Sequence, residues 1–404
     1  MQTAVFRMLA IIDTHPIQYR APVYRSLQKQ FGIPLTVVYG SDFSIKGYKD
    51  QEFGTTFAWD IDLLSGYNSI FLSQVSQGGA LCFDDVSGKG LSQTLDRLKP
   101  KAILLTGYQH RLYKSAIFKS WKSRYPILFR AETTDHARSR NSFNRCIRDI
   151  SLQLLYHNCQ KLLYIGQRSK QHFQRLSCPD EKLIRSPYCI DPSPFQLNDI
   201  DHTTCRRTTR QKFGISDSQV ILLFSGKLSD RKRPDLILKA AKHLPTKIRD
   251  RIIVMFLGNG ELAESLNQEA ACEPSIKTHF LGFQNQTALS CYYHTADLLI
   301  LPSQHSETWG LVVNEALHHG LPAIVSDAVG CAPDLIIPGE TGAVFDVNSA
   351  ESLAQAIMRS LSLVNRIDVH QNCRNHVNKY SVEKAAAGIT QAYQEVLQKR
   401  GKKE

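Results

Sequence analysis

Two carboxylates, Glu307 and Glu315, stand eight residues apart where a predicted loop enters a predicted helix. The apolar run at 298–301 predicts a buried strand, and residues 310–319 predict a helix that ends at Gly320. Eight helical residues span ~12 Å, and a helix N-terminus between two carboxylates offers unpaired N–H groups to an anion. This spacing suits a ligand with hydroxyl groups at both ends and a diphosphate between them, as in a nucleotide sugar. The alternative is that both glutamates are solvated charges.

The residues around this pair carry a resemblance to a known family. Residues 302–322 read PS-x3-E-x-W-G-L-x3-E-A-x3-G-x-P, which closely resembles the E-x7-E signature of retaining glycosyltransferases of family 4. The resemblance implies that Glu307 binds the hydroxyls of the donor sugar and that Glu315 binds the ribose. It also implies that four residues between them give backbone amides to the sugar and phosphate: Thr308, Trp309, Gly310 and Leu311.

The same resemblance implies the fold and the domain organisation. Family 4 enzymes have the GT-B fold, an α/β architecture in which two Rossmann-like, doubly wound parallel-sheet domains face a cleft. A chain of 404 residues is long enough for two such domains. We expect an acceptor-side domain at 1–190, a linker at 191–214 without apolar periodicity and a nucleotide-sugar-binding domain at 215–380. The last segment, 381–404, is expected to form a helix that crosses back to the first domain.

Two cations follow the strand predicted at 220–224, at the start of the second domain. The family typically has G-R-L here and a lysine shortly after it, and the two cations clamp the donor diphosphate. By position these are Gly226, Lys227 and Lys232. Lys227 departs from the family's arginine, and a lysine offers a point charge in place of a planar fork. By resemblance, the later donor-side positions are the glycine turn of Gly258 and Gly260 and the segment near the base that contains Phe283.

Two polar residues in the first half follow predicted strands. His15 comes after the strand at 9–13, and Glu132 comes after the strand at 127–129. Because ligands bind at the carboxyl ends of parallel strands, both are acceptor-side candidates. His15 could instead be a structural loop residue, and Glu132 could form a salt bridge with Arg130. We interpret Asp60-Ile61-Asp62, which imitates a D-x-D metal motif, as a chance match, and no metal site is expected.

The net charge of +12 is unevenly distributed along the chain. Residues 1–200 hold 26 basic and 16 acidic side chains, whereas residues 201–404 hold 23 and 21. Residues 101–150 alone hold 11 basic and 3 acidic ones. This asymmetry indicates either an anionic partner for the first half or a solvated basic face. A predicted helix in this segment carries Phe118 and Trp121, which would contact lipid headgroups or pack into the core.

Cysteine usage and hydropathy exclude several classes. The ten cysteines form no C-x-x-C pair and no close Cys/His cluster, so neither a zinc site nor a disulfide framework is predicted. No run of 18 apolar residues predicts a membrane span. The first residues lack a cleavage site and are interpreted as part of a first strand. We therefore expect a protein of the reducing cytosol, with peripheral contact with an anionic membrane as a further hypothesis.

Taken together, the resemblance and the residues predict a retaining, metal-independent glycosyltransferase without a cofactor. It would move a sugar from a nucleotide-sugar donor to a glycan or lipid-linked acceptor in cell-surface glycan or glycolipid synthesis. Two related GT-B activities stay open, those of a sugar phosphorylase and of a nucleotide-sugar epimerase. A basic nucleic-acid-binding protein is the alternative of another class. It is disfavoured because residues 101–150 lack the interleaved aromatics of base-stacking surfaces.

Overall fold

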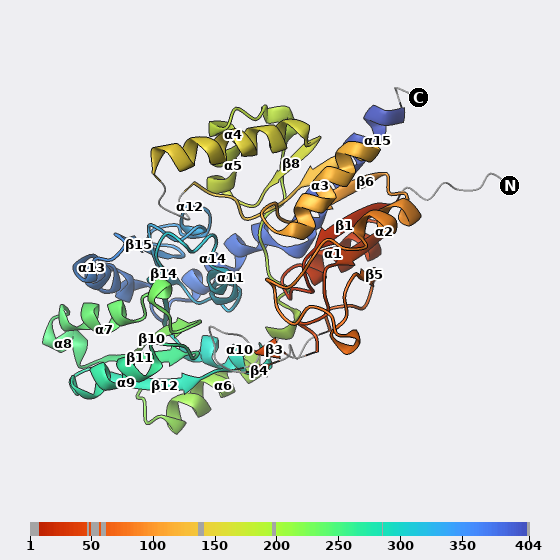
Figure 1. Cartoon of the computed structure of the whole chain (residues 1–404). Coiled ribbons are helices and arrows are strands. Elements are labelled where there is room, and N and C mark those ends of the chain that lie inside the picture. The colour runs from red at the N-terminus through yellow and green to blue at the C-terminus, as the bar shows by residue number, and fades with distance from the viewer. Residues whose placement is uncertain are drawn as a thin grey trace.

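Two parallel β-sheets, each covered by helices on both faces, make up the protein (Figure 1). The computed structural model describes residues 8–46, 48–49, 56–57, 62–135, 141–195, 199–284 and 286–401. Each sheet begins from a central strand, extends to one side and then returns to the other side of that strand. This is the doubly wound order of Rossmann-like domains. The predicted fold class is confirmed.

The first sheet has the strand order β5-β2-β1-β6-β7-β8-β9. Alternate residues of β1 point to opposite faces: Leu9 and Ile11 into one core, Ala10 and Ile12 into the other. Helices α1 (Ala21–Lys29) and α15 (Val382–Gly401) cover the first of these faces. The second face is covered by α2 (Leu91–Leu98), α3 (Arg111–Ser123), α4 (Ser142–Asn158) and α5 (Gln167–Arg175). The strands are β1 (Leu9–Asp13), β2 (Leu35–Tyr39), β5 (Asn68–Phe71), β6 (Ala102–Leu105), β7 (Ile127–Phe129), β8 (Lys161–Tyr164) and β9 (Leu183–Arg185).

The second sheet has the strand order β12-β11-β10-β13-β14-β15. One face packs against α7 (Asp235–Lys242), α9 (Ala263–Ala271) and α13 (Ala350–Ser360). The other packs against α10 (Gln286–Thr295), α11 (Leu311–His318), α12 (Ala332–Leu335) and α14 (Ile367–Val377). A short helix, α8 (Thr246–Arg249), precedes β11. The strands are β10 (Val220–Ser225), β11 (Ile252–Leu257), β12 (Lys277–Gly282), β13 (Leu298–Leu301), β14 (Ala323–Ser326) and β15 (Gly342–Phe345).

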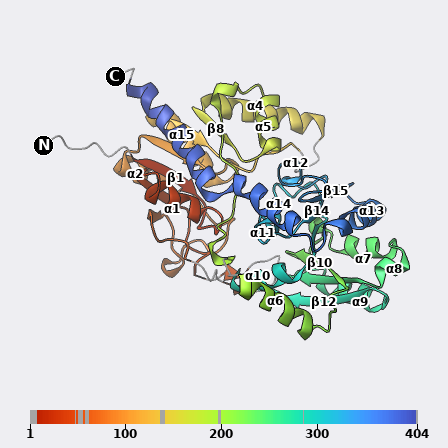
Figure 2. The ribbon, with the colours of Figure 1, turned by 180° about the vertical axis from the view of Figure 1, so that it is seen from behind.

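The last helix and the segment between the sheets connect the two halves. Helix α15 runs back along α1, as the view from behind shows (Figure 2). Residues from Val382 to Val396 bury their apolar side chains in the core of the first sheet. The segment expected to be a linker contains a helix, α6 (Asp199–Lys212), which packs against α10 of the second half. Its apolar periodicity is weak because α6 is polar on most of its surface, so the sequence pattern did not indicate a helix.

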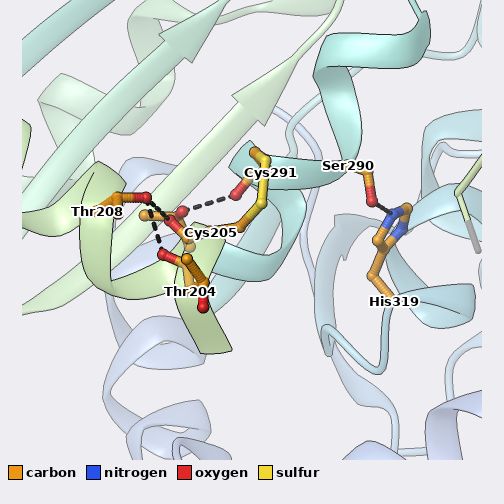
Figure 3. Close-up of a disulfide and its surroundings, with 7 residues drawn as sticks. Thr204, Cys205, Thr208, Ser290, Cys291 and His319 are labelled. Atoms are coloured by element: carbon orange, nitrogen blue, oxygen red, sulfur yellow. Dashed lines mark hydrogen bonds between the residues drawn. A yellow bond between two sulfur atoms is a disulfide. The ribbon is translucent and has the colours of Figure 1, made fainter. Parts of the chain in front are cut away.

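A disulfide between Cys205 and Cys291 corrects the expectation that no disulfide is present. It joins α6 to α10 (Figure 3). The two cysteines are 86 residues apart in the chain, so no local spacing could indicate their pairing. Only the packing of α6 on α10 brings the two sulfur atoms together.

Several further elements were not predicted from the sequence. These are the edge strand β5, the strand β15 and the helix α14. An antiparallel pair, β3 (Tyr48–Lys49) with β4 (Thr56–Phe57), was also not predicted. Of the chance D-x-D match, Asp60 and Ile61 lie outside the described residues, as does the start of the chain before Met8. The carboxylate of Asp62 accepts two backbone N–H bonds in a turn.

Candidate functional site

The loops at the carboxyl ends of both sheets meet, and they bring the candidate residues together. Tyr19, which follows β1, donates a hydrogen bond of 3.2 Å to Glu315 in α11. Thr308, which follows β13, donates one of 2.6 Å to Glu132, which follows β7. These two hydrogen bonds join the loops after β1 and β7 to the segment after β13, and β1 and β13 border the points where the strand order of their sheets reverses. Ligands of open α/β sheets bind at such points.

Glu307 is held in a network of cations and one hydroxyl. The Lys232 ammonium donates to Glu307 Oε2 in a short ion pair, and Ser303 Oγ donates to the same oxygen at 3.1 Å. The Arg231 guanidinium lies 3.6 Å away. Burial raises the pKa of Glu307, but Lys232, Arg231 and Ser303 outweigh it and hold that pKa below its usual range. The carboxylate is therefore ionised at neutral pH and retains Oε1 as a hydrogen-bond acceptor for a ligand.

Glu315 is held by two phenols and forms no ion pair with any cation in the described part of the chain. Tyr19 donates to Oε1, and Tyr293 donates to Oε2 at 2.7 Å. Burial raises the pKa of Glu315 to about 7, although both hydrogen bonds and the charge of Lys232 oppose this rise. The two glutamates of the motif thus differ: Glu307 is firmly ionised, whereas Glu315 titrates near neutral pH.

The glycines of the second sheet allow two loops to touch. Gly226 and Gly258 have φ values of 145° and 144°, and a Cβ on Gly258 would lie 1.9 Å from the Gly226 carbonyl oxygen. A Cβ on Gly260 would lie 2.5 Å from the carbonyl oxygen of Leu228. No other residue type permits this approach without a shift of backbone. Lys227 is half-buried in the loop after β10. It stands in the chain between Gly226 and Leu228, the two residues that these glycines approach.

The residues between the two glutamates form the approach to α11. Gly310 is the N-cap of this helix at φ 102°, and Leu311 is its first residue. Trp309 is buried and points away from the cleft: its Nε1 donates to Asn314 at 2.8 Å. A Cβ on Gly166, in the first half, would lie 2.4 Å from the Trp309 ring. The tryptophan therefore fixes one half against the other, which leaves only its backbone to face a ligand.

Glu132 lines a cavity of about 270 Å³ on the side of the first sheet. Both oxygens of its carboxylate are engaged, one by Thr308 and the other by the Tyr188 hydroxyl in a short hydrogen bond. The nearest cation is Arg20, at 3.9 Å. The salt bridge to Arg130 that the sequence left open is not formed, since Arg130 donates to Ser186 and to the carbonyl oxygen of Pro187 instead. The described polar and aromatic residues that line the cavity include Arg20, Thr106, Tyr108, His110, Tyr113 and Arg148.

His15 is not among the described residues that line this cavity. Its ring packs against Phe43, with 4.6 Å between centroids, and its Nδ1 lies 3.0 Å from the Thr14 hydroxyl. Burial lowers the pKa of His15 to about 4, against the opposing charge of Asp13. These contacts are those of the structural loop histidine that the sequence left as an alternative.

The site region also contains Phe283 and several residues that the sequence did not predict. Phe283 is half-buried in the loop after β12. The sequence motifs assigned no role to Tyr19, Tyr293, Ser303 or Arg231, although Ser303 stands within the E-x7-E string at 302–322. Nothing in the local pattern of α10 distinguishes Tyr293, which reaches Glu315 only through tertiary packing. The described residues contain no group of three or more His, Cys, Asp or Glu side chains placed to hold a metal ion.

Comparison with known proteins relates the second half of the chain to one family. Residues 206–381 match the family model for glycosyl transferases group 1. This chain is 30% identical over 240 aligned residues to a lipopolysaccharide 1,2-N-acetylglucosaminetransferase of Salmonella typhimurium, in an alignment that covers 57% of this chain and 60% of that enzyme. A D-inositol 3-phosphate glycosyltransferase of Geodermatophilus obscurus is 31% identical over 197 residues, 46% and 43% of the two chains. The chain thus matches less than two thirds of the length of these relatives.

Solved structures extend the likeness to the whole fold. The Anabaena protein HepE in complex with UDP has a TM-score of 0.72 at 16% identity, with 96% of this chain and 100% of that chain covered. WaaG, a glycosyltransferase involved in lipopolysaccharide biosynthesis, has a TM-score of 0.64 at 17% identity, with 95% and 98% covered. At this level of identity the likeness concerns the fold, and both halves of the chain share it.

Proposed function

We propose that the protein is a retaining glycosyltransferase that transfers a sugar from a nucleoside diphosphate to an acceptor. The observation that carries this proposal is the ion pair of Glu307 with Lys232 together with the hydrogen bond from Tyr19 to Glu315, both glutamates lying in the region that matches the group 1 family model. Glu307 accepts hydroxyl groups of the donor sugar, and Glu315 accepts those of the ribose. The named activities of the Salmonella and Geodermatophilus relatives agree with this assignment.

Charge in the cleft supports departure of the diphosphate. As the bond between sugar and phosphate breaks, negative charge grows on the leaving group, and cations placed beforehand lower the free energy of that state. Lys232 and Lys227 supply two such charges, and the residues at the start of α11 supply backbone N–H groups. Glu307 stays ionised and orients the sugar. We assign no nucleophile for a covalent intermediate, so front-face displacement with retention is the proposed course, and it requires no metal.

The cavity beside Glu132 is the proposed acceptor site. It opens at the carboxyl end of the first sheet and includes Thr308 from the donor side, so an acceptor bound there reaches the donor sugar. Its lining combines the cations of Arg20 and Arg148 with hydroxyl groups and aromatic rings. Such a lining suits a glycan, whose hydroxyls need hydrogen bonds and whose apolar faces pack on rings.

An exposed apolar surface on the first half supports an acceptor at a membrane. Phe118 and Trp121 of α3 are 68% and 51% exposed, so they do not face the core. Helix α4 adds Phe143 and Leu154, 72% and 61% exposed, at the ends of a stripe with helical spacing that also contains Ile147 and Ile150. Both helices cover the same face of the sheet. With exposed Lys114, Lys122 and Arg145 beside the apolar groups, this α3–α4 surface suits an anionic bilayer.

A cavity at the end of the stripe adds to this argument. Ile150 and Leu154 line a space of about 510 Å³ together with Leu176 and Pro179. None of the described helices is both long enough and apolar enough to pass through a bilayer. The proposed contact is therefore peripheral, with a lipid-linked acceptor at an anionic cytoplasmic membrane surface in glycan or glycolipid synthesis.

Ligand-induced stabilisation tests the proposal and identifies the donor. A nucleotide sugar that binds the folded chain raises its melting temperature, and the rise grows with the ratio of ligand concentration to Kd. The expected result is a rise with one nucleotide sugar that is much smaller in Glu315→Ala. A panel of nucleotide sugars that leaves the melting temperature unchanged would overturn the proposed function. Arg359→Gln, which alters an exposed residue of α13, is the control.

A further inference from the structure

A second cavity lies behind the proposed ribose site, between α6, α10 and α14. Its volume is about 300 Å³, at the lower end of the range for small-molecule sites. Tyr293 separates it from the cleft: the ring lines the cavity, while the hydroxyl donates to Glu315. None of the residues from Glu307 to Glu315 lines it, so the cavity is distinct from the proposed donor site.

The lining of this cavity is rich in groups that bind anions. It contains two arginines, Arg206 and Arg374, and one carboxylate, Asp297. Asp297 is already shared by Arg206, at 2.7 Å, and by Arg210, at 3.3 Å. Four histidines also line the cavity: His202, His294, His319 and His370.

Of the two arginines that line the cavity, Arg206 is paired with Asp297, whereas Arg374 has no partner among the described residues. Its half-buried guanidinium lies against Gly320 and makes no hydrogen bond or ion pair with any described residue. A guanidinium loses hydration when it is partly buried, and that cost is normally offset by a carboxylate or carbonyl group. A phosphate offers the geometry that its planar fork prefers.

A second unsatisfied donor or acceptor lies nearby. The Nε2 atom of His294 is buried and has no hydrogen-bond partner among the described residues. The His294 ring stacks on His202 at 3.8 Å and lies 4.7 Å from His319. Burial, and then the surrounding histidines and Arg374, lower the pKa of His294 to about 2. An anion beside this ring would counter the positive charge around it.

The walls of the cavity are held in place. The Cys205–Cys291 disulfide ties α6, which carries His202 and Arg206, to α10, which carries His294 (Figure 3). His319, on the opposite wall, is fixed by Ser290 at 3.0 Å and by the carbonyl oxygen of Glu315 at 2.7 Å. The rings of His202 and His294 stack on each other, and no group of three or more potential metal ligands occurs among the described residues.

We propose that this cavity binds a small phosphate-bearing metabolite, with the phosphate against Arg374 and His294. The inference does not depend on the proposed transferase activity, because it rests on different residues and is tested by binding alone. Asn365, Gln371 and Thr203 at the rim provide amide and hydroxyl groups for the rest of the ligand.

Calorimetric titration of the full chain with inorganic phosphate and with glycerol phosphate tests this inference. Loss of one charge-assisted contact weakens binding about tenfold or more, so Arg374→Gln is expected to lose that much affinity. Arg359→Gln removes the same charge at an exposed position of α13 and is expected to bind like the unaltered protein. Arg374→Lys keeps the charge and is expected to retain part of the affinity, and unchanged melting of the three ligand-free variants shows that they are folded.

Two results would overturn the inference. One is the absence of measurable binding of both probes at millimolar concentration. The other is binding that is lost in Lys232→Ala but unchanged in Arg374→Gln, since it would place the phosphate in the donor cleft. Neither result concerns transferase activity, so failure here leaves the proposed function intact, and failure of the transferase assay leaves this site intact.

Discussion

Tyr19 and Glu315, 296 residues apart in the chain, are joined by a hydrogen bond of 3.2 Å across the cleft. The phenol belongs to the loop after the first strand, and the carboxylate to the helix that follows β13. The proposed ribose site is therefore built from both halves of the molecule. A ligand group that donates to Glu315 Oε1 would share that oxygen with the Tyr19 hydroxyl.

Glu307→Gln is expected to reduce transfer by at least about 100-fold, because the charge that orients the donor sugar in the cleft is lost. The measurement is kcat/KM for sugar transfer by the purified variant. Turnover equal to that of the unaltered enzyme would refute the role of Glu307. Glu307→Ala should in addition lower the free energy of unfolding by about 1–3 kcal/mol, because the mostly buried Lys232 ammonium loses its partner.

Glu315→Ala is expected to act on donor binding more than on the chemical step. Loss of one charge-assisted hydrogen bond, about 1.5–3 kcal/mol, raises the donor KM roughly tenfold or more. Steady-state kinetics with varied donor separate KM from kcat. Tyr293→Phe, which removes one support of the carboxylate, serves as a milder comparison. A fall in kcat with unchanged KM would assign Glu315 a different role.

Lys232→Ala is expected to cost more activity than Lys227→Arg. The first change deletes a charge from the proposed diphosphate clamp and leaves Glu307 without its ion pair, whereas the second keeps the charge and restores a planar fork. The two variants are compared by kcat/KM and by the affinity for the nucleoside diphosphate. Equal losses would show that the site around Lys227 is shaped for lysine and that its assignment is wrong.

Stability should fall as pH rises from about 5 to 8, through Glu315. The pKa of this group is about 7 in the folded state and near 4.5 in the unfolded chain, so the folded state binds more protons between these values. Folding then loses free energy as the pH rises, by at most about 3 kcal/mol. Urea unfolding of the protein and of Glu315→Gln at several pH values measures this difference. A difference between the two that does not change with pH would show that Glu315 does not titrate in this range.

The α3–α4 surface is expected to bind vesicles of anionic phospholipid at low salt and to release them as salt rises. Phe143→Ser with Leu154→Ser should weaken binding at least about tenfold, because each buried apolar side chain contributes about 1.5–3 kcal/mol. Ile367→Ser, an exposed apolar position of α14, is the control. Sedimentation that shows no binding even at low salt would refute membrane contact and favour a soluble acceptor.

Short buried strands were predictable because each one is a continuous run of apolar residues in the sequence. The bounds of β1, β7 and β13 agree with the strands predicted at 9–13, 127–129 and 298–301. Strand β5 was missed because it lies at a sheet edge and buries no residue fully. Helix α6 was missed because its polar residues contact partners that are distant in the chain, among them Asp297 and Cys291.

In the site, too, residues close together in the chain were predictable, whereas contacts between distant segments were not. The motif located Glu307, Glu315 and the residues between them, since these stand close together in the chain. It could not locate Tyr293, or show that Lys232 pairs with Glu307, because both relations arise only when the sheet places separate loops together. The hydrogen bond from Thr308 to Glu132 likewise joins the two halves of the molecule, and no local sequence pattern predicts it.

The anomeric configuration of the product tests the central claim most directly. The protein is incubated with an α-linked nucleotide sugar and a glycolipid acceptor, and the new linkage is determined by NMR. The account predicts transfer to the acceptor, release of the nucleoside diphosphate and an α linkage. A β-linked product would contradict retention, and an altered nucleotide sugar formed without acceptor would indicate an epimerase instead of a transferase.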